Sequence, residues 1–396
     1  MKFRKFIVFL LSFLLCLTVV AGCDGAQTPN DEPDDDTTVP PPASVSSITF
    51  DEGIETEYVN WYGRYYYDEK GESVYVNNAA SGFEVKFEGT LLKAEVRSRV
   101  TSSTLYDMDN QSNKKTYLGI SVDGGAYERR AISQTEIITV KLAENLADGV
   151  HTVKVLKSTE AMATELEVIS LTTDGSFTSP PEMPSLKIEV YGDSITAGYG
   201  ALKSELGQSE AMTTEQQDAL SSYGFTAAEK LGGQANVFCV SGACMGSYGL
   251  NCIPNVYTRT DPYASGQRLW DFTQYVPDAV IIDLGTNDII QNYLSAISDF
   301  ENVFKSAYKS FVQGLRDKYP DAAIIMCFGT FKYGSRTLIQ DYNTRFIQWA
   351  GEFNGEIGNV YSLQLSACAS YHATKAEHAA YAESLAAKLQ EVLGLA

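Results

Sequence analysis

The second half of the chain alternates short apolar segments with amphipathic ones, and this alternation limits the fold more than any other feature. Apolar segments of strand length occupy residues 186–190, 237–240, 279–284, 324–328 and 360–365. Apolar residues with helical spacing occur at 295–319 and 338–353. Chains that repeat strand and helix in this way form a parallel sheet with helices on both faces. We therefore predict an α/β domain over residues 186–396.

A serine follows the first of these strands. In the segment YGDSIT, Gly192 permits a sharp turn, so Ser194 is expected at the carboxyl end of the strand, at or near the start of a helix. Substrates of open α/β sheets bind at this edge, where free backbone N–H groups favour developing negative charge. A serine beside glycine and aspartate is also common in turns and helix caps. We interpret Asp193, and Asp288 after a later strand, as residues that brace turns.

Three further strand ends carry residues that can take part in chemistry at the same edge of the sheet. Gly242 follows the second strand, Asn287 follows the third in the segment GTND, and His372 follows the last. A capping box formed by Thr374 and Glu377 predicts that the C-terminal helix begins two residues after His372. Taken singly, the asparagine could cap a helix and the glycine could serve packing. Because each of them follows a strand, we expect all of them at one edge of the sheet, and their co-occurrence favours a shared functional site over separate structural roles.

The order of serine, glycine, asparagine and histidine, each after a strand, resembles the four sequence blocks of the SGNH (GDSL-type) hydrolases. That resemblance implies a flavodoxin-like three-layer sandwich around the parallel sheet. It also implies that Ser194 is the nucleophile and His372 the proton shuttle. The oxyanion would lie among the backbone N–H groups of Ser194 and Gly242 and the side-chain amide of Asn287. No cofactor is implied.

Residues 45–176 have the pattern of an all-β domain. Phe83, Val85 and Phe87 alternate with charged residues, as in a strand with one buried face, and residues 150–156 alternate again. Turn signals recur at short intervals without helical periodicity, so we predict a β-sandwich. His151 shares a face with apolar residues of its strand and is interpreted as a hydrogen-bonded core or edge histidine. Prolines at 180, 181 and 184 mark a short linker to the α/β domain.

Motifs in both domains extend the resemblance to nearly the whole chain after about residue 45. The segments WYGR (61–64), SGFEVKFEGT (81–90) and VDG (122–124) resemble the jelly-roll domain of family-two carbohydrate esterases, and YGDSITAGYG (191–200) resembles their nucleophile block. These enzymes remove acetyl groups from plant polysaccharides such as xylan and glucomannan, often from the 6-hydroxyl of hexose units. Trp270 is a weaker candidate for sugar contact, since a large aromatic side chain more often lies in a core.

The histidine block departs from the usual SGNH pattern. An aspartate commonly stands two or three residues before the histidine, and here these positions are Ser370 and Ala369; the usual following proline is Ala373. Family-two esterases are known to act through a Ser-His dyad whose histidine is oriented by a backbone carbonyl, so the resemblance does not imply inactivity. His378 lies six residues after His372, inside the helix, and is interpreted as structural.

Charge and cysteine content limit the kinds of molecule that the chain is expected to bind. Without its first 43 residues the chain keeps 27 basic and 44 acidic residues, a charge of −17 that opposes binding to nucleic acid or anionic lipid and suits a neutral saccharide.

Five cysteines remain after the N-terminal region: Cys239, Cys244, Cys252, Cys327 and Cys368. A bridge between the two at 244 and 252 is compatible with the spacing, but connectivity does not follow from sequence. Three histidines and no Cys-x-x-Cys pair argue against a metal site.

The N-terminus has the pattern of an exported lipoprotein. Three basic residues precede an apolar run at 6–20, which is followed by Ala21, Gly22 and Cys23. This predicts a signal peptide at 1–22 that ends in a lipobox, with Cys23 carrying the lipid. The apolar run is too short for a transmembrane helix. An acidic, proline-rich segment at 23–44 is expected to act as a tether, so we predict a bacterial lipoprotein anchored in the cell envelope and facing the periplasm or the exterior.

The leading hypothesis is therefore a carbohydrate O-acetyl esterase acting on acetylated polysaccharide, with the membrane reached only through the lipid anchor. Fold does not determine substrate, so a lipase or thioesterase of the same fold is an alternative. A polysaccharide-binding lipoprotein whose esterase site has decayed is a second alternative. Retention of all four motif residues argues against decay, whereas the missing aspartate argues mildly for it.

Overall fold

The structure is a computed structural model. It describes residues 44–50, 55–101, 114–132, 136–203, 213–246, 251–263, 268–330 and 340–395. The predicted signal peptide, Cys23 and almost all of the predicted tether lie outside these residues. The part from Ser44 to Ala396 forms one compact unit. Among the described residues, no helix has the length and apolar character needed to cross a membrane.

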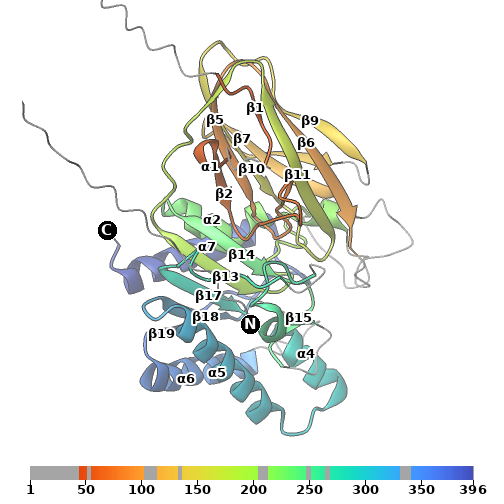
Figure 1. Cartoon of the computed structure of the whole chain (residues 1–396). Helices are drawn as coiled ribbons and strands as arrows, with labels where there is room; N and C mark the ends of the chain where they lie inside the picture. The colour runs from red at the N-terminus through yellow and green to blue at the C-terminus, as the bar shows by residue number, and fades with distance from the viewer. Residues whose placement is uncertain are drawn as a thin grey trace, which may run out of the picture. The chain divides into compact units, whose positions relative to one another are not determined.

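Two antiparallel sheets form the first domain (Figure 1). One has the order β3-β4-β11-β6-β9, with β1 pairing β11: β1 Ser47–Ile48, β3 Tyr66–Tyr67, β4 Val74–Tyr75, β6 Leu92–Val100, β9 Ile137–Ala143 and β11 Thr164–Thr173. The other has the order β12-β5-β10-β7-β8, with β2 pairing β5: β2 Val59–Tyr62, β5 Gly82–Glu88, β7 Thr116–Val122, β8 Glu128–Ile132, β10 Val150–Lys157 and β12 Ser176–Thr178. A short helix, α1 Glu55–Tyr58, precedes β2. The predicted β-sandwich is confirmed.

Strand β5 shows why these residues form a sandwich. Phe83, Val85 and Phe87 are at most 2% exposed and belong to the domain's apolar core, whereas the charged residues between them point away from it. This is the period-two burial expected of a strand with one face in a core. His151 on β10 lies at the domain edge, where its ring nitrogens bond to Asp123 Oδ2 and the Ala147 carbonyl.

A five-stranded parallel sheet forms the centre of the second domain. Its order is β14-β13-β17-β18-β19, with bounds β13 Lys187–Gly192, β14 Gln234–Cys239, β17 Ala279–Asp283, β18 Ala323–Phe328 and β19 Val360–Gln364. This is the 2-1-3-4-5 order of flavodoxin-like sheets. Figure 1 shows α2 Tyr223–Lys230 and α7 Lys375–Leu393 on one face, and α5 Phe300–Lys318 and α6 Gln340–Ile357 on the other. The predicted three-layer α/β fold is confirmed.

One predicted helix has a different start. The apolar spacing placed it at 295–319, but α4 Thr286–Ser295 ends there and α5 begins only at Phe300. Ala296 and Asp299 between them have φ values of 44° and 54°, in the left-handed region that interrupts a right-handed helix. Neither residue is a glycine; Ser298 and Asp299 favour turns, but the apolar spacing alone did not reveal this break.

The two domains meet through a buried arginine. Arg64 follows β2, and its Nη2 lies 2.9 Å from Glu189 Oε1 and 2.6 Å from the Tyr191 hydroxyl, both on β13. Its guanidinium also stacks 4.5 Å above the ring of Phe238 on β14. The side chains of Arg64 and Glu189 are both 0% exposed. A buried pair of this kind stabilises a junction only when both charges keep their hydrogen bonds, and here Nη1 adds a bond to the Arg259 carbonyl.

Candidate active site

The nucleophile turn begins where β13 ends. Gly192 is required there because a Cβ at this position would lie 1.9 Å from the Thr196 hydroxyl oxygen, which packs over the turn. Ser194 is followed by successive tight turns in place of the expected regular helix: the Ala197 N–H bonds to the Asp193 carbonyl, and Gly198 has a φ of 68°. Glycines with positive φ at this point stop a helix from forming.

Ser194 and His372 meet at the carboxyl edge of the sheet. Ser194 Oγ lies 2.8 Å from His372 Nε2, and the two residues are 9% and 6% exposed. His372 lies in the loop between β19 and α7, and α7 begins with the predicted capping box of Thr374 and Glu377. The structure therefore brings together, at hydrogen-bond distance, two residues that are 178 positions apart. A nucleophile and a base at this distance can exchange a proton.

The His372 imidazole is neutral in this environment. Burial, and to a smaller extent the neighbouring His378, lower its pKa to about 3. The edges of Tyr199 and Tyr371 pack against the ring with centroid separations of 4.8 and 4.7 Å. Ser370 donates a 2.8 Å hydrogen bond to the carbonyl of His372, so its hydroxyl holds the loop backbone. A neutral imidazole is the form that accepts the serine proton.

His378 is placed differently. It lies inside α7, is fully buried and stacks almost parallel to Tyr223 at 6.2 Å. Tyr381 packs on it edge-on at 6.0 Å. Burial lowers the pKa of its imidazole to about 4. Its ring therefore contributes to packing between α7 and α2, and Ser194 Oγ has His372 as its partner.

Two of the expected oxyanion donors are available. Gly242 has a φ of 75° in a turn closed by a 3.0 Å bond from the Ala243 N–H to the Val240 carbonyl. Within the described part of the chain, the N–H groups of Ser194 and Gly242 have no acceptor. Such backbone donors can receive the negative oxygen of a tetrahedral intermediate.

The third expected donor, the Asn287 amide, is engaged. Its Nδ2 donates to Asp193 Oδ2 at 3.0 Å and to the Ala243 carbonyl at 2.9 Å, which uses both amide hydrogens. Asn287 lies inside α4, whose N-cap is Gly285, so it does not cap that helix. In this geometry the amide ties the nucleophile turn to the segment after Gly242, and an oxyanion would have to share one of these hydrogens.

Buried carboxylates surround this edge. Asp288 accepts from the N–H groups of Met245 and Gly246 at 2.8–3.0 Å, and Asp193 accepts from the Ile195 N–H. Both brace turns, as interpreted from the sequence. Burial, reinforced by Asp283, raises the pKa of the Asp193 carboxyl well above its usual range. Among the described residues these acids do not converge as ligands for a metal ion.

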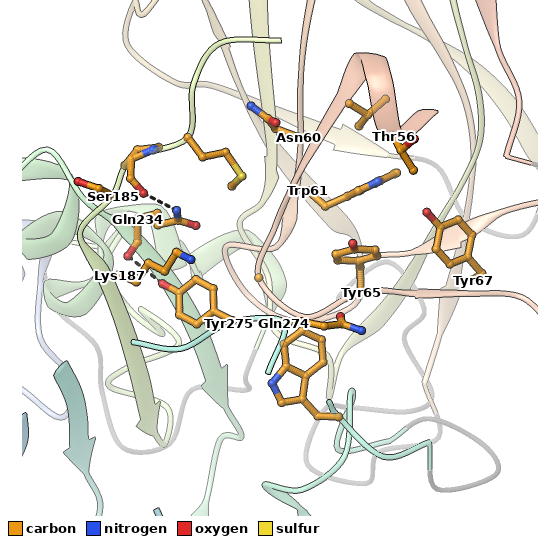
Figure 2. A pocket seen from close by; sticks show the side chains of 15 residues that line it. Thr56, Asn60, Trp61, Tyr65, Tyr67, Ser185, Lys187, Gln234, Gln274 and Tyr275 are labelled. Carbon is orange, nitrogen blue, oxygen red and sulfur yellow. Dashed lines mark hydrogen bonds between the residues drawn. The ribbon is translucent and has the colours of Figure 1, made fainter. Parts of the chain in front are cut away.

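Trp270 lies elsewhere. It is 6% exposed and lines a pocket of about 590 Å³ between the two domains (Figure 2). Trp61 and Tyr65, stacked at 5.3 Å, line the same pocket from the sandwich, and Lys187 and Gln234 line it from the amino ends of β13 and β14. Ser194 follows the carboxyl end of β13, so the structure does not bring Trp270 to the nucleophile.

All five described cysteines carry free thiols. Cys244 and Cys252 are nevertheless register partners on two short parallel strands, β15 Ala243–Cys244 and β16 Asn251–Cys252. Sequence proximity thus identified residues that lie opposite one another, while the thiols are unbridged in this structure.

Comparison with known proteins agrees with the fold. The sequence pattern of the GDSL-like lipase/acylhydrolase family matches residues 190–388, about half of the chain, and the chain belongs to this family. The carbohydrate esterase 2 N-terminal domain matches residues 61–181. The resemblance inferred from the sequence blocks is therefore confirmed in both domains.

Among curated proteins, the chain is 31% identical over 297 residues to the cellulase/esterase CelE of Acetivibrio thermocellus, covering 72% of this chain and 35% of that protein. The chain thus spans about a third of the length of that relative. It is 27% identical over 267 residues to an acetylxylan esterase / glucomannan deacetylase of Cellvibrio japonicus, covering 64% of this chain and 71% of that protein.

Among solved structures, a family-two carbohydrate esterase from Clostridium thermocellum in complex with cellohexaose has a TM-score of 0.74 and 27% identity, covering 85% of this chain and all of that one. The acetyl xylan esterase Est2A from Butyrivibrio proteoclasticus has a TM-score of 0.75 at 20% identity, covering 89% of this chain and all of that one. The second likeness shows the shared two-domain fold.

Proposed function

We propose that the protein is a carbohydrate O-acetyl esterase that removes acetyl groups from plant polysaccharides such as xylan and glucomannan. The observation that carries the proposal is the 2.8 Å contact between Ser194 Oγ and a neutral His372, beside two unengaged backbone N–H groups. The esterase names of the relatives and the family-two N-terminal domain support a saccharide ester as substrate. The acidic body suits a neutral glycan.

The geometry supports a two-step acyl transfer. Ser194 Oγ attacks the acetyl carbonyl carbon while His372 Nε2 takes its proton. The carbonyl oxygen becomes negative and accepts hydrogen bonds from the N–H groups of Ser194 and Gly242, with the Asn287 amide as a third donor after it releases one of its present acceptors. As the intermediate collapses, the imidazolium gives its proton to the departing sugar oxygen. Water then hydrolyses the acetyl-enzyme with the same histidine as base, which releases acetate and restores the serine.

Acetate release from acetylated glucomannan and acetylated xylan tests this function. The rate of the wild-type enzyme on these polysaccharides is compared with its rate on long-chain p-nitrophenyl esters and on an acyl thioester. Release of acetate from the polysaccharides with little action on the others supports the proposal. Preference for the long acyl chain or the thioester would indicate a lipase or thioesterase, and polysaccharide binding without any acetate release would indicate a decayed site.

We further propose that the protein is a bacterial lipoprotein attached to a membrane of the cell envelope through Cys23, facing the periplasm or the exterior. The supporting observation is the basic and apolar N-terminal sequence that ends in Ala-Gly-Cys. Metabolic labelling with an alkyne-modified fatty acid tests it. The wild-type protein should be labelled and found with membranes, whereas Cys23→Ser should be unlabelled; labelling of that variant would refute Cys23 as the site.

A further inference from the structure

A glutamate of the sandwich domain reaches into the edge where Ser194 lies. Glu160 belongs to the loop between β10 and β11 and is fully buried. Its Oε2 accepts a 2.8 Å bond from the Ser241 N–H, and its Oε1 accepts a 2.5 Å bond from the Ser241 hydroxyl. Oε1 also accepts from Gln217 Nε2 at 3.0 Å. One carboxylate therefore holds Ser241 by its main chain and its side chain at once.

Ser241 immediately precedes the expected oxyanion donor Gly242. The two are the central residues of the turn closed between Val240 and Ala243, and the positive φ of Gly242 belongs to that turn. The direction of the Gly242 N–H is set by the peptide plane that it shares with Ser241. The hydrogen bonds from the Ser241 N–H and hydroxyl to a single buried carboxylate fix the preceding peptide plane and the Ser241 side chain, and thereby the Ser241 Cα from which the Ser241–Gly242 plane extends.

Glu160 is itself held by hydrogen bonds from both domains. Its N–H donates to Gln217 Oε1 at 3.0 Å, so the two residues exchange two hydrogen bonds. Its carbonyl accepts from Lys157 Nζ at 3.0 Å, and the same ammonium bonds to the carbonyls of Asn77 and Thr159. Lys157 is the last residue of β10 and is fully buried. Hydrogen bonds thus run without interruption from a sandwich strand to the turn that carries Gly242.

The charge of Glu160 offers the reaction no direct advantage. A carboxylate near a developing oxyanion opposes it electrostatically. The carboxylate of Glu160 can therefore help the reaction only by holding other groups in position. A carboxylate fits that role because it accepts hydrogen bonds from three donors at once. A glutamine of the same size has one acceptor oxygen and an N–H₂ group, which would face at least one of these donors.

We infer that Glu160 is a positioning residue for deacetylation, which holds the Gly242 N–H toward the oxyanion, and that the sandwich domain is thereby part of the reacting geometry. This inference rests on the proposed function of Ser194 and His372. It assigns the sandwich a role in the turnover step in addition to any contact with saccharide.

The test compares Glu160→Gln with wild type on p-nitrophenyl acetate, which needs the same oxyanion but no polysaccharide. We expect kcat to fall by about 10- to 100-fold, less than complete removal of an oxyanion donor, while KM stays within about twofold. The matched control is Glu167→Gln, which breaks another buried carboxylate network of the sandwich, with Arg97 and Ser73, that does not touch the Gly242 turn. It should lower the unfolding midpoint and leave kcat unchanged.

Ser241→Ala supplies an independent arm, because it removes only the hydroxyl contact, and it carries the test if Glu160→Gln does not fold. A smaller loss of kcat is expected, and the double variant should lose no more than Glu160→Gln alone. Equal kcat values for wild type and both variants would overturn the positioning role. Failure of wild type to deacetylate polysaccharide, with p-nitrophenyl acetate still cleaved, would instead refute the proposed substrate and leave this comparison intact.

Discussion

At the carboxyl edge of the sheet Ser194 and His372 meet as two neutral side chains, whereas at the domain junction Arg64 and Glu189 meet as two charges. The edge must let a proton move and therefore keeps its base neutral through burial. The junction must stay fixed, and its two ions are 0% exposed and hydrogen-bonded to one another. The difference indicates that a buried ion pair holds the domain junction, whereas the reacting pair meets through a hydrogen bond between neutral groups.

The largest effect that distinguishes the two regions is expected for Ser194→Ala. Acetate release should fall to background because the variant lacks the hydroxyl that lies 2.8 Å from His372 Nε2. The unfolding midpoint should change little, since the hydroxyl serves chemistry and makes no core contact. Acetate assay and thermal unfolding of the same preparation check this. Retained activity with an unchanged melting curve would remove Ser194 as the nucleophile.

His372→Ala should follow, with a loss of about 10⁶-fold in kcat, the size seen when a serine protease loses its catalytic histidine. Ser370→Ala is the matched control, because its hydroxyl bonds to the His372 carbonyl and leaves the ring untouched. We expect that variant to stay within a few-fold of wild type. An equal collapse in both variants would show that Ser370 orients the base.

At the junction, Arg64→Met should lower the free energy of unfolding by about 3–5 kcal/mol, because it leaves Glu189 charged and buried without its partner. The comparison is Lys230→Ala, which breaks an exposed pair with Glu383 and should cost less than about 1 kcal/mol. Chemical denaturation of both variants measures the difference. Equal, small losses would mean that the buried charge pair does not hold the junction.

Asn287→Ala tests whether the edge contains a brace of its own, since the Asn287 amide lies there and bonds to Asp193 and the Ala243 carbonyl. We expect kcat to fall by about 10²–10³-fold with KM nearly unchanged, the size of one oxyanion donor. The unfolding midpoint should fall as well, because the bonds to Asp193 and Ala243 are lost. A lowered midpoint with an unchanged kcat would show that the amide serves only as a brace.

The smallest effect concerns acid stability. The pKa of His378 is about 4 in the folded protein, below the usual value of 6.5, so its contribution is complete above pH 6.5 and is lost as the pH falls toward 4. His378→Phe, which keeps a ring on Tyr223, should therefore show a shallower loss of stability between pH 7 and 5 than wild type. Denaturation midpoints at both pH values measure it. The same slope in both proteins would contradict a buried, neutral His378.

Local sequence patterns predicted those parts of the fold and of the site that depend on neighbouring residues. The five strands, the capping box before α7 and the order of Ser194, Gly242, Asn287 and His372 all depend on neighbours a few positions away, which periodicity and turn chemistry reveal. The structure then placed the serine and histidine at 2.8 Å.

Contacts between distant residues could not be read in this way. Glu160 stands in a loop of the other domain, 81 positions before Ser241, and nothing in its own sequence neighbourhood marks it. The two hydrogen bonds that occupy the Asn287 amide depend on packing within the α/β domain. The placement of Trp270 at the amino ends of the strands depends on how the two domains pack. Each of these features follows from tertiary packing, which a motif does not encode.

Strand β14 lies at an edge of the parallel sheet that the sandwich domain contacts. It is the last strand at one end of the parallel sheet, yet all six of its residues are buried, and Arg64 of the sandwich stacks on its Phe238. An uncovered edge strand is a template for pairing with other chains. We expect that an α/β domain separated at the linker would expose this strand and self-associate. The sandwich therefore protects the edge strand, and the two domains are expected to be stable only together.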